Sequence, residues 1–263
     1  MKIDGRAIAS QILNEISEEV KTLKRKPCFA IILAGSDSSS QSYIKQKVQK
    51  AKEVGIATQI FKFDQTANRK NVLVLIHKLN KSPKYQGIII QRPTFEQLNT
   101  AEIYYSITPS KDIDGFLPNS PFDPPIALAV LKIIKTIPSA GKFEHKNVLV
   151  VGKGETAGRP IANFLNNQGF HVEIADSKSD LESLIKNSDI VVSAVGKKVI
   201  TKNFLRKNVT LIGVGIRKDK DGLLKGDYDE KEIKDIVGYY TTTPGGVGPV
   251  NVAYLLKNVV KRV

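Results

Sequence analysis

The segment Val148-Leu-Val-Val-Gly-Lys-Gly-Glu-Thr-Ala-Gly158 decides the fold class that we expect for this chain. Its apolar residues predict a buried strand, and the glycines after them predict a tight loop that opens a helix. Gly154 has no side chain to block a pyrophosphate, and a helix N-terminus favours negative charge. The spacing G-x-G-x-x-x-G is one residue longer than the commonest dinucleotide-binding pattern, so a tight βα turn without a ligand is the alternative.

The residues around this segment alternate between strand and helix. The expected elements are a strand at 147–151, a helix at 157–168, a strand at 171–175, a helix at 178–187, and strands at 189–195 and 209–214. This order is a mononucleotide-binding βαβαβ pattern with short connections. A turn-rich loop at 243–249 precedes an apolar helix at 250–261, with Pro249 at its first turn.

The first half of the chain also alternates, which predicts a second α/β unit with a largely parallel sheet. The expected elements are a helix at 4–24, a strand at 29–34, a helix that follows capping residues 37–40 and stops at Gly55, a strand at 58–63, a helix at 69–80 and a strand at 86–90. A proline-rich passage at 106–125 separates the halves. Asp123 is expected to cap a connecting helix that starts at Pro124.

The composition is that of a soluble globular protein, with 41% hydrophobic and 25% charged residues. There is no apolar run of about 18 residues and no signal-peptide pattern, so we expect no membrane association. The single cysteine, Cys28, fits a reducing compartment, and we expect a cytoplasmic protein. The net charge of +14 suits either nucleic acid or an anionic substrate, and the scattered lysines favour the substrate.

Tyr43 and Lys47 lie one helical turn apart and face the same way. A lysine that is desolvated or near other cations can move protons near neutral pH, and an aromatic ring can stack on a flat heteroaromatic substrate. The alternative is a solvated helix, because Lys45 and Lys50 are neighbours. A Tyr-x-x-x-Lys pair also occurs in short-chain dehydrogenases, but there it follows the nucleotide loop, so its position here excludes that family.

Two further polar residues are candidates for binding a substrate. Gln91 ends an apolar strand at the carboxyl edge, where α/β sites form. Asp114, before Gly115, could accept hydrogen bonds from substrate N–H groups. The alternatives are a polar strand end and an Asp-Gly turn. No cluster of His, Cys and Asp has the spacing of metal ligands.

Asp176 falls where an acidic residue binds the ribose 2′-hydroxyl of NAD. Lys153, Ser177 and Lys178 could instead surround the 2′-phosphate of NADP. A solvated strand-end cap is the third explanation of Asp176.

Taken together, these residues resemble the bifunctional methylenetetrahydrofolate dehydrogenase/methenyltetrahydrofolate cyclohydrolase family, the FolD proteins. The resemblance covers nearly the whole chain, in family order. It is carried by Ile3-Asp-Gly-Arg6, Ser40-x-x-Tyr-x-x-x-Lys47, Gly87-Ile-Ile-Ile-Gln-Arg-Pro93, Pro109-Ser-Lys-Asp-Ile-Asp-Gly115, the Gly152–Pro160 loop and Pro244-Gly-Gly-Val-Gly-Pro249.

The resemblance implies oxidation of 5,10-methylenetetrahydrofolate with a nicotinamide cofactor, followed by hydrolysis of the methenyl product to 10-formyltetrahydrofolate. It implies that Lys47 transfers protons, Gln91 orients Lys47, Tyr43 stacks on the folate and Asp114 anchors the pterin. The implied cofactor is NADP, with NAD as the alternative. The residues implied to bind it are Gly152, Lys153, Gly154, Asp176, Ser177, Gly215 and Ile216, and those implied to lie beside the folate are Gly245, Gly246 and Pro249.

The implied fold is two α/β domains, with the C-terminal helix returning to the first domain. Residues 1–120 plus 248–263 would form the catalytic, folate-binding domain, and residues 121–247 a Rossmann-like dinucleotide-binding domain. The implied partners are polyglutamated tetrahydrofolate derivatives and a second copy in a homodimer, with no nucleic acid and no membrane.

Several positions depart from the family pattern, mostly in the cofactor half. The usual Gly-Arg-Ser is Gly152-Lys-Gly154, and lysine is a poorer bidentate partner than arginine. The other departures are Phe122 and Ile126 near the junction, Gly213, and Asn251. The alternative is therefore a family member that has cyclohydrolase activity or folate binding but whose dehydrogenase is impaired or prefers NAD.

Overall fold

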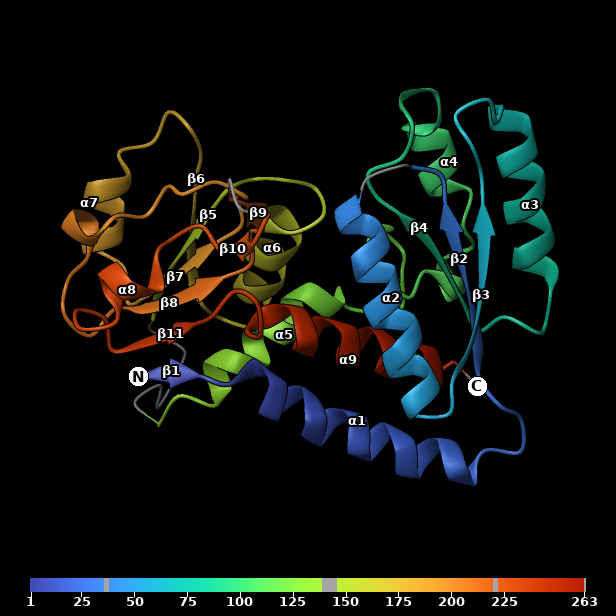
Figure 1. The fold of residues 1–263 in the computed structure, drawn as a ribbon, viewed down its shortest axis with the longest axis horizontal. Helices are drawn as coiled ribbons and strands as arrows, with labels where there is room; N and C mark the ends of the chain where they lie inside the picture. The colour runs from blue at the N-terminus through green and yellow to red at the C-terminus, as the bar shows by residue number, and fades with distance from the viewer. Residues whose placement is uncertain (36–37, 139–145, 220–221, 263) are drawn as a thin grey trace. The chain divides into compact units, whose positions relative to one another are not determined.

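The computed structural model describes residues 1–35, 38–138, 146–219 and 222–262, which form two compact units (Figure 1). One unit consists of Met1–Ala9 and Ile126–Asn251, and we call it the six-stranded unit after its main sheet. The other consists of Ser10–Pro125 and Val252–Val263, and we call it the three-stranded unit. Neither unit is a single stretch of sequence.

The three-stranded unit is built on a parallel sheet in the order β3-β2-β4. Its strands are β2 (Cys28–Leu33), β3 (Ala57–Lys62) and β4 (Gly87–Gln91). Both β2 and β4 are buried along their whole length, as expected for parallel strands covered on two faces. Figure 1 shows α2 (Ser38–Glu53) and α3 (Arg69–Lys81) on opposite sides of this sheet.

One face of this sheet packs on α3 and on α4 (Ala101–Tyr105). The core there consists of alternate strand residues, such as Ala30, Ile32 and Ile88, with Val72 and Ile76 of α3. Short 3₁₀ helices at Glu96–Leu98 and Pro109–Lys111 continue the chain. The helices α1 (Gly5–Thr22) and α9 (Val247–Val260) contribute most of their length to this unit.

The six-stranded unit has a parallel sheet in the order β1-β11-β8-β7-β5-β6. Its strands are β1 (Lys2–Ile3), β5 (Asn147–Val151), β6 (His171–Ala175), β7 (Ile190–Ser193), β8 (Thr210–Gly213) and β11 (Tyr239–Thr241). The register pairs the last residue of β5 with the last residues of both β6 and β7, and Ser193 with Gly213. The loops that follow β5, β6, β7 and β8 therefore leave the sheet at one edge.

Helices cover this sheet as the βαβαβ pattern predicts. The helix α6 (Gly158–Asn167) packs on β5 and β6, and an apolar cluster joins the strands to α7 (Leu181–Lys186) and α8 (Glu230–Ile233). The helix α5 (Pro125–Lys135) and a 3₁₀ helix at Lys202–Phe204 complete the unit. A small hairpin pairs β9 (Arg217–Lys218) with β10 (Leu224–Lys225).

The structure differs from our expectations at the ends of elements and at the start of the chain. The expected first domain included residues 1–9, but β1 pairs with β11, which groups Met1–Ala9 with the six-stranded unit. The expected cap at Asp123 is wrong, because α5 begins at Pro125 and Pro124 is the residue directly before it. Asp37, expected among the capping residues of α2, lies outside the described residues.

Candidate active site

Lys47, on the third turn of α2, directs its ammonium group at the end of β4. Its Nζ donates a hydrogen bond of 3.1 Å to Oε1 of Gln91, and both side chains are buried. The ammonium also lies 4.7 Å from the centroid of the Tyr43 ring, one helical turn earlier. The structure thus brings Tyr43, Lys47 and Gln91 together, and the prediction that Lys47 is an ordinary solvated lysine is excluded.

Burial and one carboxylate shift the pKa of Lys47 in opposite directions. Burial lowers the pKa of the Lys47 ammonium, and the negative charge of Asp114 acts in the opposite direction. Burial likewise raises the pKa of Asp114, against the charges of Lys47 and Arg92. A lysine whose pKa is lowered, held by a neutral amide oxygen and not by a carboxylate, is suited to proton transfer near neutral pH.

Arg92, next to Gln91 in the sequence, is a residue that our sequence reasoning missed. Its guanidinium carbon lies 3.7 Å from the centroid of the Tyr104 ring and 5.9 Å from that of Phe116. Its backbone oxygen accepts a hydrogen bond from Oγ of Ser40 at the start of α2. The sequence motif that ends in Gln-Arg-Pro could have indicated it, because the motif places the cationic Arg92 directly after Gln91 at the end of the strand.

The loop that carries Asp114 is fixed from both sides. Before it, the buried Asp112 carboxylate accepts a 2.8 Å hydrogen bond from the backbone N–H of Leu117, and burial raises the pKa of Asp112 to about 6. Across it, the buried amide of Asn258 in α9 donates to the carbonyl oxygens of Ile113 at 3.0 Å and Asp123 at 3.2 Å. Both donors of one amide are thereby used to hold the loop.

In the six-stranded unit, the residues predicted to bind a dinucleotide lie at the carboxyl ends of three parallel strands of one sheet. Gly152, Lys153 and Gly154 follow β5, Asp176 and Ser177 follow β6, and Gly215 and Ile216 lie just beyond β8. Ligands of open parallel sheets bind at this edge. The structure brings these residues to one edge of one sheet.

The glycines of the loop after β5 fit the approach of a phosphate group. Gly152 has a φ of +102°, a conformation that favours glycine. A Cβ at Gly158 would lie 1.8 Å from the carbonyl oxygen of Gly152, so only glycine allows the helix to pack this closely. A Cβ at Gly154 would meet nothing within 4 Å, which leaves its backbone open to a ligand. Gly152 therefore serves the tight turn and Gly158 the packing, whereas no neighbouring atom requires glycine at 154.

A buried carboxylate shapes the same edge, and our sequence reasoning missed it. Asp227 accepts hydrogen bonds from Oγ of Ser193 at 2.6 Å and from the backbone N–H groups of Val195 and Gly196 at 2.8 Å each. A Cβ at Gly215 would lie 2.3 Å from its oxygens. Asp227 thus fixes the loop after β7 and requires glycine after β8. Its partners lie more than 30 residues away in the sequence, which leaves no local signal.

The loop that contains Gly245 and Gly246 follows β11 and belongs to the six-stranded unit. Gly245 has a φ of +108°, and a Cβ at Gly5 would lie 1.9 Å from the carbonyl oxygen of Gly246. The start of the chain therefore packs on this loop. Pro249 stands in the first turn of α9, as predicted. Lys47 and Asp114 belong to the other unit. The roles of Gly245, Gly246 and Pro249 beside a folate therefore stay a prediction.

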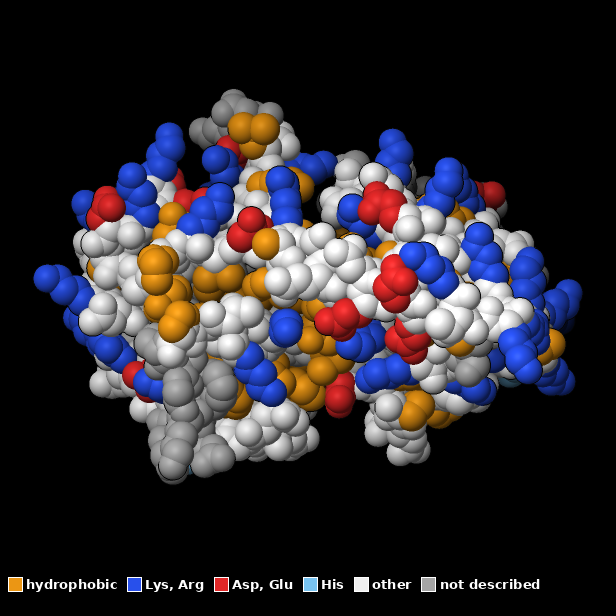
Figure 2. All heavy atoms as spheres, turned by 90° about the horizontal axis from the view of Figure 1, so that it is seen from below, with side chains coloured by type: hydrophobic (Ala, Val, Ile, Leu, Met, Phe, Trp, Pro, Cys, Tyr) orange, Lys and Arg blue, Asp and Glu red, His pale blue; other side chains and the backbone are white. Residues whose placement is uncertain are grey.

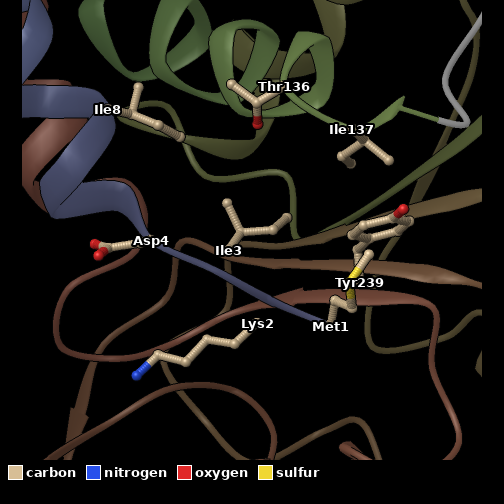
Figure 3. Close-up of a pocket in the computed structure, with 8 residues that line it drawn as sticks. All are labelled: Met1, Lys2, Ile3, Asp4, Ile8, Thr136, Ile137 and Tyr239. Carbon is tan, nitrogen blue, oxygen red and sulfur yellow. The ribbon is translucent and has the colours of Figure 1, made fainter.

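A cavity of about 250 Å³ lies beside β1, the outermost strand on one side of the six-stranded sheet (Figure 3). Its lining residues come from the start of the chain, the end of α5 and the first residue of β11: Met1, Lys2, Ile3, Asp4, Ile8, Thr136, Ile137 and Tyr239. None of the residues predicted to bind a substrate or a cofactor lines it.

Among the residues with described positions, no three His, Cys, Asp or Glu side chains are grouped as a metal site requires. No helix in the described part of the chain has the length and apolar character needed to span a membrane. Figure 2 shows Lys and Arg side chains scattered among Asp and Glu over one face, as the sequence predicts.

Comparisons with known proteins agree with this arrangement. The model of the tetrahydrofolate dehydrogenase/cyclohydrolase catalytic domain matches residues 3–114, and that of its NAD(P)-binding domain matches residues 124–263. A bifunctional protein FolD from Staphylococcus aureus (strain JH9) is 34% identical over an alignment of 272 positions that covers 98% of this chain and 94% of that protein.

Solved structures of the same kind superpose over the whole chain. The bifunctional FolD enzyme of Campylobacter jejuni has a TM-score of 0.94 at 32% identity, covering 100% of this chain and 98% of that one. The FolD enzyme of Trypanosoma brucei, solved with NADP and an inhibitor, has a TM-score of 0.92 at 29% identity and covers 100% and 96%. The expected two-domain α/β fold is confirmed, and the chain belongs to the tetrahydrofolate dehydrogenase/cyclohydrolase family.

Proposed function

We propose that this chain oxidises 5,10-methylenetetrahydrofolate to the 5,10-methenyl compound with a nicotinamide dinucleotide and then hydrolyses that product to 10-formyltetrahydrofolate. Membership of the family supports both reactions. The observation that carries the hydrolytic step is the buried contact between Lys47 and Gln91. The oxidative step is supported by the glycine loop and Asp176 at the carboxyl edge of the six-stranded sheet.

In the hydrolysis, water adds to the methenyl carbon and loses one proton. The bond from that carbon to N5 then breaks as N5 takes up a proton and the hydroxyl oxygen gives up its own to become the formyl carbonyl, so one proton is released overall. We assign the proton transfers to Lys47, because burial lowers its pKa and makes its neutral form accessible. Gln91 accepts a hydrogen bond from Lys47 and thereby sets the direction of the amine. Tyr43 would stack on the pterin, and Asp114 would accept hydrogen bonds from its N–H groups.

The dinucleotide would be held by Gly152, Gly154, Gly215 and Ile216, with Lys153, Asp176 and Ser177 at its ribose end. When bound, its nicotinamide ring accepts the hydride that the one-carbon bridge loses. The side chains at this edge bind and orient it, and Asp227 keeps the loop after β7 in position. The resemblance implies NADP, which the Trypanosoma brucei relative contains. NAD is the alternative, and Asp176 is the residue that distinguishes them.

The remaining assignments extend the same proposal. The three-stranded unit would bind the folate and the six-stranded unit the dinucleotide. We propose a cytoplasmic enzyme of one-carbon metabolism, acting on polyglutamated folates and supplying formyl groups for purine biosynthesis. The net charge of +14 favours attraction of such anionic substrates. We also propose a homodimer, which sedimentation equilibrium of the purified protein would test.

One observation favours a narrower function as the second candidate. Gly154 stands where the family has a serine, and nothing within 4 Å of its Cβ position requires glycine. The chain therefore lacks a hydroxyl at the phosphate loop without a packing reason, which would weaken the dehydrogenase and leave the cyclohydrolase intact.

Two assays on the purified chain test these proposals. Methenyltetrahydrofolate hydrolysis is followed by loss of its absorbance above the spontaneous rate, and oxidation of methylenetetrahydrofolate is followed with NAD and with NADP. Activity in both assays supports the bifunctional enzyme. Hydrolysis alone supports the second candidate, and the absence of both reactions contradicts the proposal.

A further inference from the structure

The ribose end of the proposed cofactor site contains an ion pair. Nζ of Lys153, in the glycine loop after β5, lies 2.5 Å from Oδ2 of Asp176, the residue directly after β6. The backbone N–H of Lys178 donates to the other oxygen, Oδ1, at 2.9 Å. The backbone N–H of Asp176 donates to Oγ of Ser179, which closes the turn. The carboxylate is thus oriented by two donors from two loops.

This arrangement leaves the carboxylate able to bind hydroxyl groups. An ionised carboxylate has about four acceptor positions on its two oxygens. Lys153 donates to Oδ2 and the backbone N–H of Lys178 donates to Oδ1, and the carboxylate retains acceptor capacity for a ligand. The Asp176 side chain is 28% exposed. The adjacent 2′- and 3′-hydroxyls of a ribose are donors that suit such a group.

The same arrangement opposes a 2′-phosphate. The hydrogen bond from Lys153, together with those from the turn, lowers the pKa of Asp176, so the carboxylate is ionised at neutral pH. It can donate no hydrogen bond to a phosphate and repels its charge. The Lys153 ammonium contacts this carboxylate, and Asp176 already neutralises it. An approaching phosphate would have to compete with Asp176 for that ammonium.

We infer that Asp176 makes this chain select NAD over NADP, and that Lys153 orients Asp176 and does not serve a 2′-phosphate. The inference rests on the proposed function only in requiring that a nicotinamide dinucleotide binds at this edge. It opposes the cofactor that the family resemblance implies.

The test measures binding, independently of any folate reaction. Isothermal titration calorimetry on the full chain compares 5′-AMP with adenosine 2′,5′-bisphosphate, and NAD with NADP. We expect the compounds without the 2′-phosphate to bind about tenfold more tightly, the size of one hydrogen bond to a charged group. This comparison needs no variant, so a folding defect cannot obscure it.

Substitutions then distinguish the role of Asp176 from that of Lys153. In Asp176→Ser the freed Lys153 can meet a 2′-phosphate, so NADP should bind about tenfold more tightly and NAD about tenfold more weakly. Adding Lys153→Ala to Asp176→Ser should abolish the NADP gain. Asp235→Ser, at an exposed carboxylate of the same unit, is the matched control and should change neither affinity.

The inference is overturned if the unmodified chain prefers adenosine 2′,5′-bisphosphate to 5′-AMP, or if Asp176→Ser leaves the ratio of NAD to NADP affinity unchanged. A chain that binds none of the four compounds also overturns it. A chain that prefers NAD but oxidises no folate upholds the inference and contradicts the proposed oxidation.

Discussion

The side-chain oxygen of Gln91 accepts a hydrogen bond of 3.1 Å from the ammonium nitrogen of Lys47, and both groups are buried. An amide oxygen stabilises an ammonium less than a carboxylate would, because it carries no net charge. The pair therefore orients the lysine without fixing it in its protonated form.

Replacement of Lys47 should remove hydrolysis and spare the fold. Lys47→Met keeps the length and apolar stem of the side chain, and we expect methenyl hydrolysis to fall at least about 100-fold, the lower range of general acid–base catalysis. Lys45→Ala, at an exposed lysine of the same helix, is the control and should retain full activity. Hydrolysis that survives in Lys47→Met at the native rate would show that another group moves the protons.

Replacement of Gln91 by glutamate should shift the pH profile. A carboxylate beside Lys47 favours its ammonium form and raises its pKa. If neutral Lys47 is the base, the rising limb of kcat for hydrolysis should move to higher pH in Gln91→Glu. Gln91→Ala, which removes the acceptor without adding charge, should lower kcat without that upward shift. A limb that stays in place in Gln91→Glu would contradict Lys47 as the titrating base.

Replacement of Asp114 should move the rising limb of the kcat–pH profile to lower pH. The Asp114 charge raises the pKa of Lys47 against the effect of burial, so Asp114→Asn should lower that pKa further. The rising limb of kcat should then appear at lower pH, even though weaker pterin binding increases KM. Saturating substrate isolates this effect, and an unchanged limb would show that Asp114 does not act on Lys47.

The buried Asp112 carboxylate should make stability depend on pH. Burial raises its pKa from 3.8 to about 6, so the native chain binds more protons than the unfolded chain between these values. The associated stability is present below about pH 4 and is lost as pH rises to about 6, a change of about 3 kcal/mol.

Asp112→Asn should remove this part of the decline, because asparagine is neutral throughout and its oxygen can still accept from Leu117. Urea unfolding at several values between pH 4 and pH 7 measures the slope, with Asp235→Asn as an exposed control. Equal slopes in the native chain and Asp112→Asn would refute the assignment.

Asn258 should stabilise the Asp114 loop from a distance. Asn258→Ala leaves the carbonyl oxygens of Ile113 and Asp123 without their amide donors, and we expect a loss of about 1–3 kcal/mol in the free energy of unfolding. The pterin affinity should fall as well, since Asp114 follows Ile113 directly. Asn167→Ala, at an exposed residue at the end of α6, is the control. A destabilised variant with native folate affinity would show that the amide supports the fold alone.

Elements with their own apolar pattern were predictable from the sequence. The runs that form β2, β4 and β5 are continuous and apolar, and glycines mark the loop after β5. Elements that exist only through a distant partner were not predictable. The two residues of β1 form a strand because β11, more than 230 residues later, pairs with them.

The candidate site divides in the same way. Lys47, Gln91 and Asp114 were predictable because each stands in a short motif. In the structure, Lys47 donates a hydrogen bond to Gln91 and interacts with the charge of Asp114. Asp227 and Asn258 act through contacts with residues that lie far away in the sequence, and nothing near either one distinguishes it from a surface polar residue.

The hydrogen bonds from Asn258 to Ile113 and Asp123 also determine when the chain can complete the proposed folate site. A ribosome makes Ile113 145 residues before it makes Asn258. The strands β2, β3 and β4 can pair while the chain is still being made, since domains fold as they emerge. The carbonyl groups on either side of Asp114 must wait for α9. The proposed hydrolytic site is therefore completed late in synthesis, and a prematurely terminated chain would carry Lys47 without a fixed Asp114.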